Sequence, residues 1–431
     1  WKYFPLLIAV FGQVPEDPME KKRLAYITQV SSGFDGITPY IRSDGELAFK
    51  TTYAINKGHP MIGVELDLSI TSMDVYEWSP YLTACSEECK LAARLIYLRF
   101  VDKSQSFFSN YVKGLSHKVH SMPAWEEVEL DELEHFNLLK ATINESTFVV
   151  ESFKEYHSLG SGKIPNSLLE FETWKWAFGH VIRGSIGIPL KIWRSAKGYK
   201  PREEDDKRNG LAFYPMIETV RHCPVKNTDR LAIRLGVEQK PPLIFLHADR
   251  KFATGEEVCF DHGPYNNLRL VYQEGRVLFP NPYDFYIHTI NNDKPQYCEA
   301  LLDRDSCTFK ISLTLSDDML RYVRAYTSDT FEVEVQEDYA KYYASLGSDG
   351  PETKEKFLKS VRMYRTEFKR HILPQVYRKP LRQMRRKAKT EDNLHAKAAT
   401  ELGVTSVQLM LKHLEAADRL LMKLYASDLE L

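Results

Sequence analysis

The sequence lacks a net charge and any long hydrophobic run. Its 431 residues carry 58 Lys and Arg against 59 Asp and Glu, so the chain as a whole has no electrostatic signature. The longest apolar run covers residues 6–11, far short of the roughly 20 residues of a membrane span, so we expect no membrane partner. No signal peptide and no repeat of fixed period are evident. The sequence begins with Trp1 rather than Met, which is consistent with a leader or transit segment before it.

The six cysteines lack the spacing of a zinc site. They stand at positions 85, 89, 223, 259, 298 and 307. Cys85 and Cys89 are four residues apart, and this spacing fits successive turns of one helix face better than a metal-ligand pair. We therefore predict no metal and free thiols in an intracellular, reducing compartment. A mitochondrial location fits a trimmed N-terminus and the basic stripe at residues 362–389.

What the sequence does contain is enough apolar material for sizeable cores. Hydrophobic residues make up 43 % and charged residues 27 %, the values of a soluble protein of two or three domains. Alternating or short apolar runs between turn residues predict strands at 37–40, 47–49, 61–64, 211–214, 232–234 and 243–246. Apolar residues at spacings of three and four predict helices over 84–115, 130–160, 166–184, 317–326, 353–371, 380–389 and 404–425. The charged segment 195–210 is expected to be an exposed loop.

One stretch places side chains at a turn suited to a ligand. Residues 256–260 form a short β-favouring run, Gly263 and Pro264 break it, and a periodic segment follows. Asp261 and His262 therefore stand where a strand ends in a turn.

This stretch also carries motifs of a known family. Gly255-Glu-Glu257, Gly263, Asn267, Tyr272, Gly275, Asn281-Pro282 and Asp284 occur in the order typical of its C-terminal signature. Gly45, Ala48, Ile55, Gly58, Val64 and Ile70 match its opening. The sequence thus resembles the SET-domain protein-lysine methyltransferases of the Rubisco large-subunit methyltransferase type.

The resemblance implies an α+β fold. It predicts a SET β-fold with a helical insert, followed by an α-helical C-terminal lobe that binds the protein substrate in this family. The expected divisions are an N-terminal extension (1–32), the first SET part (33–84), the insert (85–190), the second SET part (191–292) and the lobe (305–431).

The resemblance also assigns site residues. S-adenosylmethionine would contact Gly45, Arg183, Arg221 and His222, and the catalytic tyrosine of the family falls on His262. Arg42 stands where an acidic residue is expected, while Asp44 and Glu46 are nearby but out of register.

These changes argue against a working methyl-transfer site. Arg42, Arg183 and Arg221 would crowd one small pocket, which is unfavourable unless an anion joins them. An alignment slip would explain each change alone. His262 could instead serve as a general base, with Tyr265 swinging in.

Structural interpretations of the same residues stay open. A histidine near a turn is commonly a structural residue, which applies to His222 and His262. Without the family match, Arg183 fits a salt bridge on a helix surface.

A basic stripe lies in the C-terminal part. Glu367 is the only acid between residues 362 and 389. The eleven basic residues there are Arg362, Arg365, Lys369, Arg370, Arg378, Lys379, Arg382, Arg385, Arg386, Lys387 and Lys389. A solvated face is the common explanation, and RNA or an acidic protein surface is the functional one.

The leading functional hypothesis is a methyltransferase fold with lost or weakened activity, a pseudoenzyme. The protein would serve as a binding, scaffold or assembly subunit of a larger complex, such as a mitochondrial ribonucleoprotein or the mitoribosome, with protein partners on the C-terminal lobe. The alternative is an active S-adenosylmethionine-dependent protein-lysine N-methyltransferase. A nucleic-acid-binding module is a third class, disfavoured because the basic stripe is a small part of the chain.

Overall fold

The computed structural model divides the chain into two compact units. Unit 1 comprises Trp1–Glu127, Thr142–Tyr265 and Arg269–Arg276, and unit 2 comprises Val128–Ala141, Asn266–Leu268 and Val277–Leu431. The structure describes residues 35–42, 46–75, 82, 84–104, 106–126, 130, 139–159, 163–196, 209–223, 233–236, 243–278, 281–284, 286–289, 308–311, 362, 366, 381–390 and 393–429.

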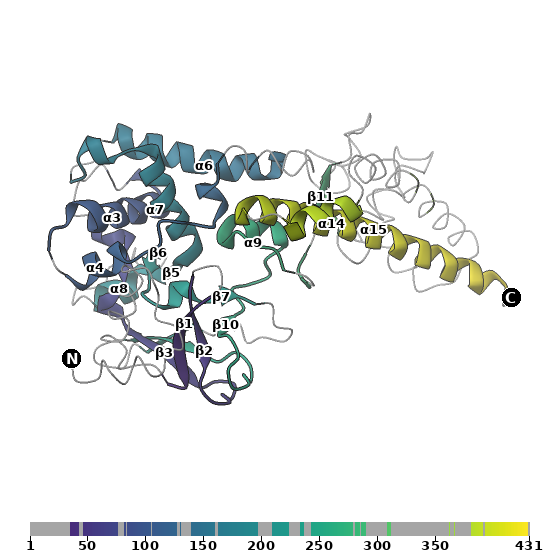
Figure 1. Cartoon of the computed structure of the whole chain (residues 1–431), viewed down its shortest axis with the longest axis horizontal. Coiled ribbons are helices and arrows are strands. Elements are labelled where there is room, and N and C mark those ends of the chain that lie inside the picture. The colour runs from purple at the N-terminus through teal and green to yellow at the C-terminus, as the bar shows by residue number, and fades with distance from the viewer. Residues whose placement is uncertain are drawn as a thin grey trace, which may run out of the picture. The chain divides into compact units, whose positions relative to one another are not determined.

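Unit 1 is built on short strands in small sheets (Figure 1). An antiparallel hairpin joins β1 (Ile37–Ile41) to β2 (Leu47–Thr51). The two three-stranded antiparallel sheets have the orders β3-β9-β8 and β4-β6-β5. Their strands are β3 (Pro60–Glu65), β9 (Leu243–His247), β8 (Ile233–Gly236), β4 (Ile70–Thr71), β6 (Asn209–Phe213) and β5 (Ser185–Pro189). The predicted strands at 37–40, 47–49, 61–64 and 243–246 are confirmed, as are 211–213 of the strand predicted at 211–214 and 233–234 of the strand predicted at 232–234.

A parallel pair, β7 (Arg221–His222) and β10 (Cys259–Phe260), brings together segments far apart in the sequence. Of the β-favouring run 256–260, only Cys259 and Phe260 form a regular strand, because only these two residues pair with β7. Glu257 instead forms an isolated bridge with Lys50 of β2.

The helices of unit 1 follow the predicted periodicity with one break. The long helices are α3 (Glu87–Ile96), α6 (Leu139–Ser158) and α7 (Phe171–Gly184), and the shorter ones are α4 (Phe107–Lys113), α8 (Leu190–Ala196) and α9 (Asn267–Glu274). The first three residues of α6 and the first two of α9 belong to unit 2. Single 3₁₀ turns span Leu66–Leu68, Ser72–Val75, Met122–Ala124, Asn166–Leu168 and Ile217–Thr219.

The predicted helix 84–115 is wrong as one element. A π-helical turn, Tyr97–Val101, ends α3, and α4 begins anew after Ser106. The Ser106 hydroxyl accepts a hydrogen bond from the Ser109 backbone N–H at 3.2 Å, the usual way to begin a helix.

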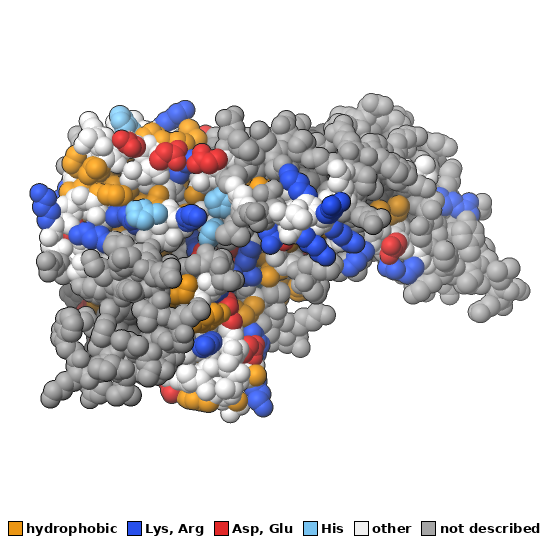
Figure 2. All heavy atoms as spheres, viewed as in Figure 1, with side chains coloured by type: hydrophobic (Ala, Val, Ile, Leu, Met, Phe, Trp, Pro, Cys, Tyr) orange, Lys and Arg blue, Asp and Glu red, His pale blue; other side chains and the backbone are white. Residues whose placement is uncertain are grey.

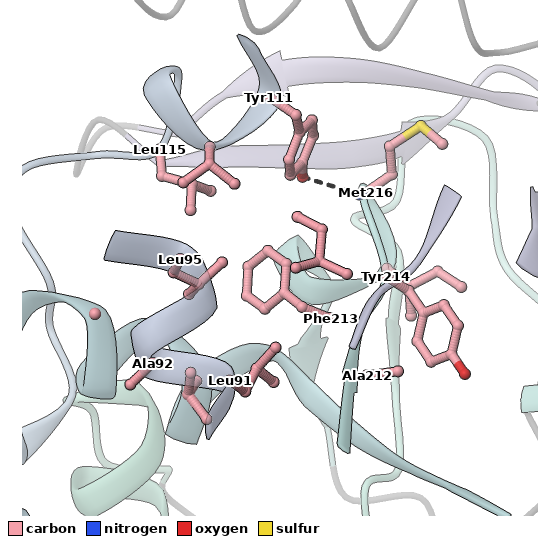
Figure 3. Packing of buried hydrophobic residues seen from close by; sticks show 14 of the residues in the cluster. Leu91, Ala92, Leu95, Tyr111, Leu115, Ala212, Phe213, Tyr214 and Met216 are labelled. Carbon is pink, nitrogen blue, oxygen red and sulfur yellow. Dashed lines mark hydrogen bonds between the residues drawn. The ribbon is translucent and has the colours of Figure 1, made fainter. Parts of the chain in front are cut away.

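The core of unit 1 lies between α3 and the sheet that contains β6 (Figure 3). Leu91 and Leu95 of α3 are fully buried, as is Phe213 of β6. Each large aliphatic side chain buried in this way contributes about 1.5–3 kcal/mol. The Tyr111 hydroxyl accepts a hydrogen bond from the Met216 backbone N–H at 3.0 Å, which joins α4 to the loop after β6.

Unit 2 contains helical and strand elements. β11 (Tyr286–Thr289) pairs with β12 (Thr308–Ile311), and α14 (Leu381–Thr390) packs along α15 (Leu394–Leu429). The predicted helices at 380–389 and 404–425 are therefore confirmed.

Within unit 2, Asn267 of the family-like motif is held in a polar network. Its Nδ2 donates to Asp284 Oδ2 at 2.7 Å, its Oδ1 accepts from the Leu278 N–H at 2.9 Å, and Asn281 also contacts it.

Several predictions lie outside the described residues. These are the N-terminal extension, residues 197–208 of the loop, helix 317–326, nearly all of helix 353–371, Gly45, Arg378, Lys379 and the side chain of Arg382. The division of the chain at 33–84, 85–190, 191–292 and 305–431 stays a prediction. No helix among the described residues combines the length and apolarity that a bilayer crossing requires.

Candidate functional site

The site in unit 1 is organised around the buried carboxylate of Glu46, which directly precedes β2. The backbone N–H of Arg42 donates to the Glu46 carbonyl at 2.8 Å and closes the β1–β2 turn. The Glu46 residue itself is buried, with only 9 % of it exposed.

Three arginines from three separate elements converge on this carboxylate. Arg183 of α7 contacts both oxygens, with Nη2 at 2.9 Å from Oε2. Arg221 of β7 donates to Oε2 at 2.6 Å, and Arg42 lies 3.4 Å from the same oxygen. His120 Nε2 is 3.7 Å from Oε1. Burial alone raises the pKa of Glu46, but Arg183, Arg221 and His120 outweigh it and hold that pKa far below its ordinary value.

A second carboxylate, Glu257, completes this ion cluster. Arg42 donates to its Oε1 through Nη2 at 2.7 Å and through Nε at 3.0 Å, and the Tyr40 hydroxyl donates to Oε2. Burial and then Glu257 raise the pKa of Tyr40 to about 12. Burial favours a higher pKa for Glu257, but the bonds from Arg42 and Tyr40 lower it on balance. We call Arg42, Glu46, Arg183, Arg221 and Glu257 the Glu46 cluster.

The structure therefore corrects one step of the sequence argument. The three arginines do meet, as predicted, but the anion that joins them belongs to the chain itself. Glu46 is out of register with the acidic residue of the family, yet its side chain is the one at the centre. The formal charge of the Glu46 cluster is three positive minus two negative, or +1.

A small cavity lies beside the Glu46 cluster. Glu46, Arg183, His180, Phe213 and Glu218 are among its lining residues. Its volume is about 30 Å³. That is room for about two water molecules, whereas sites for drug-sized ligands measure about 300–1,000 Å³.

The second part of the site is a pair of histidines at the ends of β7 and β10. The His262 backbone N–H donates to His222 Nδ1 at 3.1 Å, so a neutral His222 carries its proton on Nε2. The two rings lie 5.7 Å apart edge to face, and Phe260 lies over His262 at 4.0 Å. Among the described residues, neither histidine Nε2 has a hydrogen-bond partner.

Both histidines are neutral at pH 7. Burial is the main cause, and it lowers the pKa of His262 to about 4 and lowers that of His222 as well. The nearby Glu274 accepts from the His222 N–H at 2.9 Å and from Arg276 Nε at 2.7 Å. Burial favours a higher pKa for Glu274, but Arg276 outweighs it and the pKa falls to about 2.

The low pKa of His262 weakens the hypothesis that this residue is a general base for a lysine substrate. Moving a proton from a lysine side chain with a pKa near 10.4 to a His262 with a pKa near 4 costs roughly 9 kcal/mol. His262 is therefore a weak base as it stands. Tyr265 does lie close, with its ring 5.4 Å from His222 and 6.3 Å from His262.

A separate set of residues could offer metal ligands. Cys85, Cys89 and Glu155 bring their ligand atoms within 4.8 Å of one another among the described residues. The Cys89 thiol donates a hydrogen bond to Cys85, and this bond, followed by burial, raises the pKa of Cys89 strongly, so this thiol is protonated at pH 7. Only Cys89 belongs to α3, and Cys85 lies before the N-cap Ser86, so the prediction that both cysteines share one helix face is wrong.

The prediction of free thiols is wrong for another pair. Cys223, directly after β7, and Cys259 of β10 form a disulfide with a Cα–Cα distance of 5.6 Å. The pairing was missed because the two positions are 36 residues apart and become neighbours only when β7 pairs with β10.

Comparison with known proteins gives a match in structure alone. No protein-family model and no curated protein matches the sequence. The SET domain of LSMT bound to lysine and AdoHcy superposes with a TM-score of 0.67 at 17 % identity, over 94 % of this chain and 92 % of that one. Rubisco LSMT bound to AdoMet gives 0.66 at 18 % identity over 94 % and 92 %, and its complex with sinefungin and monomethyllysine gives 0.65 at 17 % over 96 % and 93 %. The chain therefore has the α+β SET-domain fold of the Rubisco LSMT structures, as the sequence led us to expect.

Proposed function

We propose that this protein has the methyltransferase fold without the methyl-transfer function, and that it acts as a binding or scaffold subunit of a larger complex. The observation that carries the proposal is the Glu46 cluster. S-adenosylmethionine would need an acid for its ammonium group and a cation for its carboxylate. In this chain Glu46 and Arg183, which could serve these ends, bind each other.

Two further observations support the proposal. The cavity beside the Glu46 cluster is about 30 Å³, too small for a nucleoside cofactor. The position of the catalytic phenol holds His262, a poor base with a pKa near 4. A reaction that depends on positioned polar groups would lose both its cofactor contacts and its phenol.

Methyl transfer can be tested directly. Purified protein is incubated with S-adenosylmethionine labelled in its methyl group and a lysate as a source of acceptors, with Rubisco LSMT and its own substrate as the positive control. We expect no label above that obtained with a His262→Ala variant. Label that requires His262 would refute the loss of activity.

The second candidate is an active lysine methyltransferase, and the position of Tyr265 favours it. A tyrosine ring within 5.4 Å of His222 could supply the missing phenol after a local rearrangement. In that case Tyr265→Phe would abolish the labelling, while the conservative His262→Gln would reduce it less.

The partner of the proposed scaffold is inferred from α14. Arg385, Arg386 and Lys389 are exposed, Lys387 is half-buried, and Ala388 is buried. Figure 2 shows Lys and Arg side chains gathered over α14. The helix contains no Asp or Glu.

This arrangement fits a phosphate backbone. Positions 385, 386 and 389 have the spacing of one helix face, so their charges lie along one side of α14. We therefore propose RNA, in a ribonucleoprotein such as the mitoribosome, as the surface that α14 contacts. Further basic residues of the predicted stripe, including Arg378 and Lys379, lie outside the described residues.

Binding to a short single-stranded RNA, with a polyglutamate peptide for comparison, tests this surface. We expect the triple variant Arg385→Gln, Arg386→Gln, Lys389→Gln to weaken RNA binding and to lower the salt-dependence slope by about 2. The matched control neutralises three exposed lysines of unit 1, Lys103, Lys118 and Lys251, and should bind as the parent does. Equal losses in both triples, or preference for polyglutamate, would exclude a specific RNA surface on α14.

A further inference from the structure

The disulfide between Cys223 and Cys259 lies beside a positive charge. Arg250 donates from Nη1 to Cys223 Sγ at 3.1 Å and from Nη2 to Cys259 Sγ at 3.3 Å. Both cysteines are half-buried and therefore partly open to solvent. By contrast, Cys85 and Cys89 are buried, with 3 % and 0 % exposure.

Arg250 is held in this position from three sides. Its guanidinium lies over the Phe252 ring at 4.2 Å, and it forms ion pairs with Glu256 at 3.0 Å and Asp249 at 3.5 Å. A disulfide carries no charge and needs no counter-ion. A thiolate does, and a neighbouring arginine lowers the pKa of a cysteine thiol and raises its reactivity.

We propose that Cys223 and Cys259 form a redox-active pair that exchanges between dithiol and disulfide with a low-molecular-weight disulfide such as oxidised glutathione. One thiolate attacks a glutathione sulfur, forms a mixed disulfide and releases one glutathione thiolate. The second cysteine thiolate then attacks the mixed disulfide and releases the other. The protein loses two electrons and two protons, and one oxidised glutathione becomes two reduced molecules.

The redox state of this pair acts on the histidine site. β7 and β10 have two residues each, so few backbone hydrogen bonds join them. Cys223 directly follows His222, and Cys259 is three residues before His262. The disulfide therefore fixes the two short strands that hold both imidazoles, and its reduction loosens them.

Thiol reactivity provides the first test. The protein is fully reduced and alkylated with iodoacetamide over a range of pH, and each cysteine is followed by mass spectrometry. At pH 7 we expect Cys223 and Cys259 to react at least about tenfold faster than the buried Cys85 and Cys89, with apparent pKa values below the ordinary 8.5.

Variants separate the role of Arg250 from general effects. Arg250→Gln should slow alkylation of Cys223 and Cys259 about fivefold at pH 7. Lys251→Gln, the same charge change at an exposed neighbour, should leave the rates unchanged. Equal rates in both variants, or an ordinary pKa for the two thiols, would overturn the assignment.

Equilibration in glutathione buffers and imidazole NMR complete the test. As the ratio of reduced to oxidised glutathione rises, Cys223 and Cys259 should change from fully disulfide-bonded to fully reduced. The C–H resonances of His222 and His262 should shift over the same range of ratios. The Cys223→Ser, Cys259→Ser variant should resemble the reduced protein. A bond that survives millimolar reduced glutathione is a structural disulfide and contradicts the proposal. None of these outcomes depends on whether the chain transfers methyl groups.

Discussion

At the scale of single residues, one buried carboxylate determines the electrostatics of the site. Glu46 contacts Arg42, Arg183 and Arg221, and each of these guanidinium groups is itself largely buried. A buried charge without its partner is costly, so the arginines depend on Glu46 as much as Glu46 depends on them. The sequence contained all four residues, but it could not show that Glu46 is buried among the three arginines.

Replacing the Glu46 carboxylate should therefore destabilise the fold strongly. We expect Glu46→Gln to lower the free energy of unfolding by about 3–5 kcal/mol at pH 7. Glu257→Gln is the matched control, because the Glu257 side chain is 36 % exposed and its loss should cost about 1 kcal/mol or less. Urea unfolding of both variants measures the difference. Equal costs would show that the Glu46 cluster is not held by the buried carboxylate.

Comparison of the parent with Glu46→Gln also predicts how the stabilising contribution of Glu46 changes with pH. The folded-state pKa of Glu46 lies below its ordinary 4.5, so its stabilising contribution is present above that pH and is lost as the pH falls. The gap between the parent and Glu46→Gln should thus narrow as the pH falls below 4.5. A gap that stays constant down to acid unfolding would contradict the depressed pKa.

His262 makes a separate contribution, in a different pH window. The unfolded chain binds a proton at His262 near pH 6.5, whereas the folded chain binds it only near pH 4. Since the unfolded state holds more protons between these values, stability falls as the pH falls from 6.5 to 4, by roughly 3 kcal/mol. His262→Phe should remove this slope in urea unfolding experiments, and a slope identical to that of the parent would place His262 in solvent.

At the scale of elements, the spacing of apolar residues predicted individual strands and helices well, but it did not predict which strands pair. The strands at 37–40 and 61–64 and the helix at 166–184 were predicted from spacing alone, and β1, β3 and α7 confirm them. The parallel pairing of β7 and β10 could not be predicted, because two-residue strands carry no periodicity of their own. With it, the sequence missed the disulfide and the contact between His222 and His262.

Gly275 directly follows α9, and the structure shows why this motif position requires glycine. Its φ is +64°, and a Cβ at this position would overlap the backbone carbonyl of His120. We expect Gly275→Ala to cost at least about 3 kcal/mol of stability, measured by thermal unfolding. Gly58 has φ of +86° with nothing within 4 Å of a Cβ, so Gly58→Ala should cost only about 1 kcal/mol. Similar costs would mean that backbone strain alone, without the overlap, explains the glycine at 275.

At the scale of the whole molecule, the fold was easier to predict from the sequence than the function. The order of motifs from Gly45 to Asp284 was enough to indicate a SET fold, and solved structures at 17–18 % identity match it over more than nine tenths of the chain. Fold and activity are separate properties, since a site depends on a few side chains that a fold tolerates in many versions. The cluster of arginines around Glu46 and the histidine at position 262 are such side chains.

The most direct measurement is calorimetric titration of the purified chain with S-adenosylmethionine and S-adenosylhomocysteine. Rubisco LSMT, which has been observed with AdoMet bound, serves as the positive control. If the Glu46 cluster takes the place of the cofactor contacts, neither ligand will give binding heat at millimolar concentration. Micromolar binding of either ligand would show that the arginines release Glu46 for the cofactor, and it would contradict the proposed loss of methyl transfer.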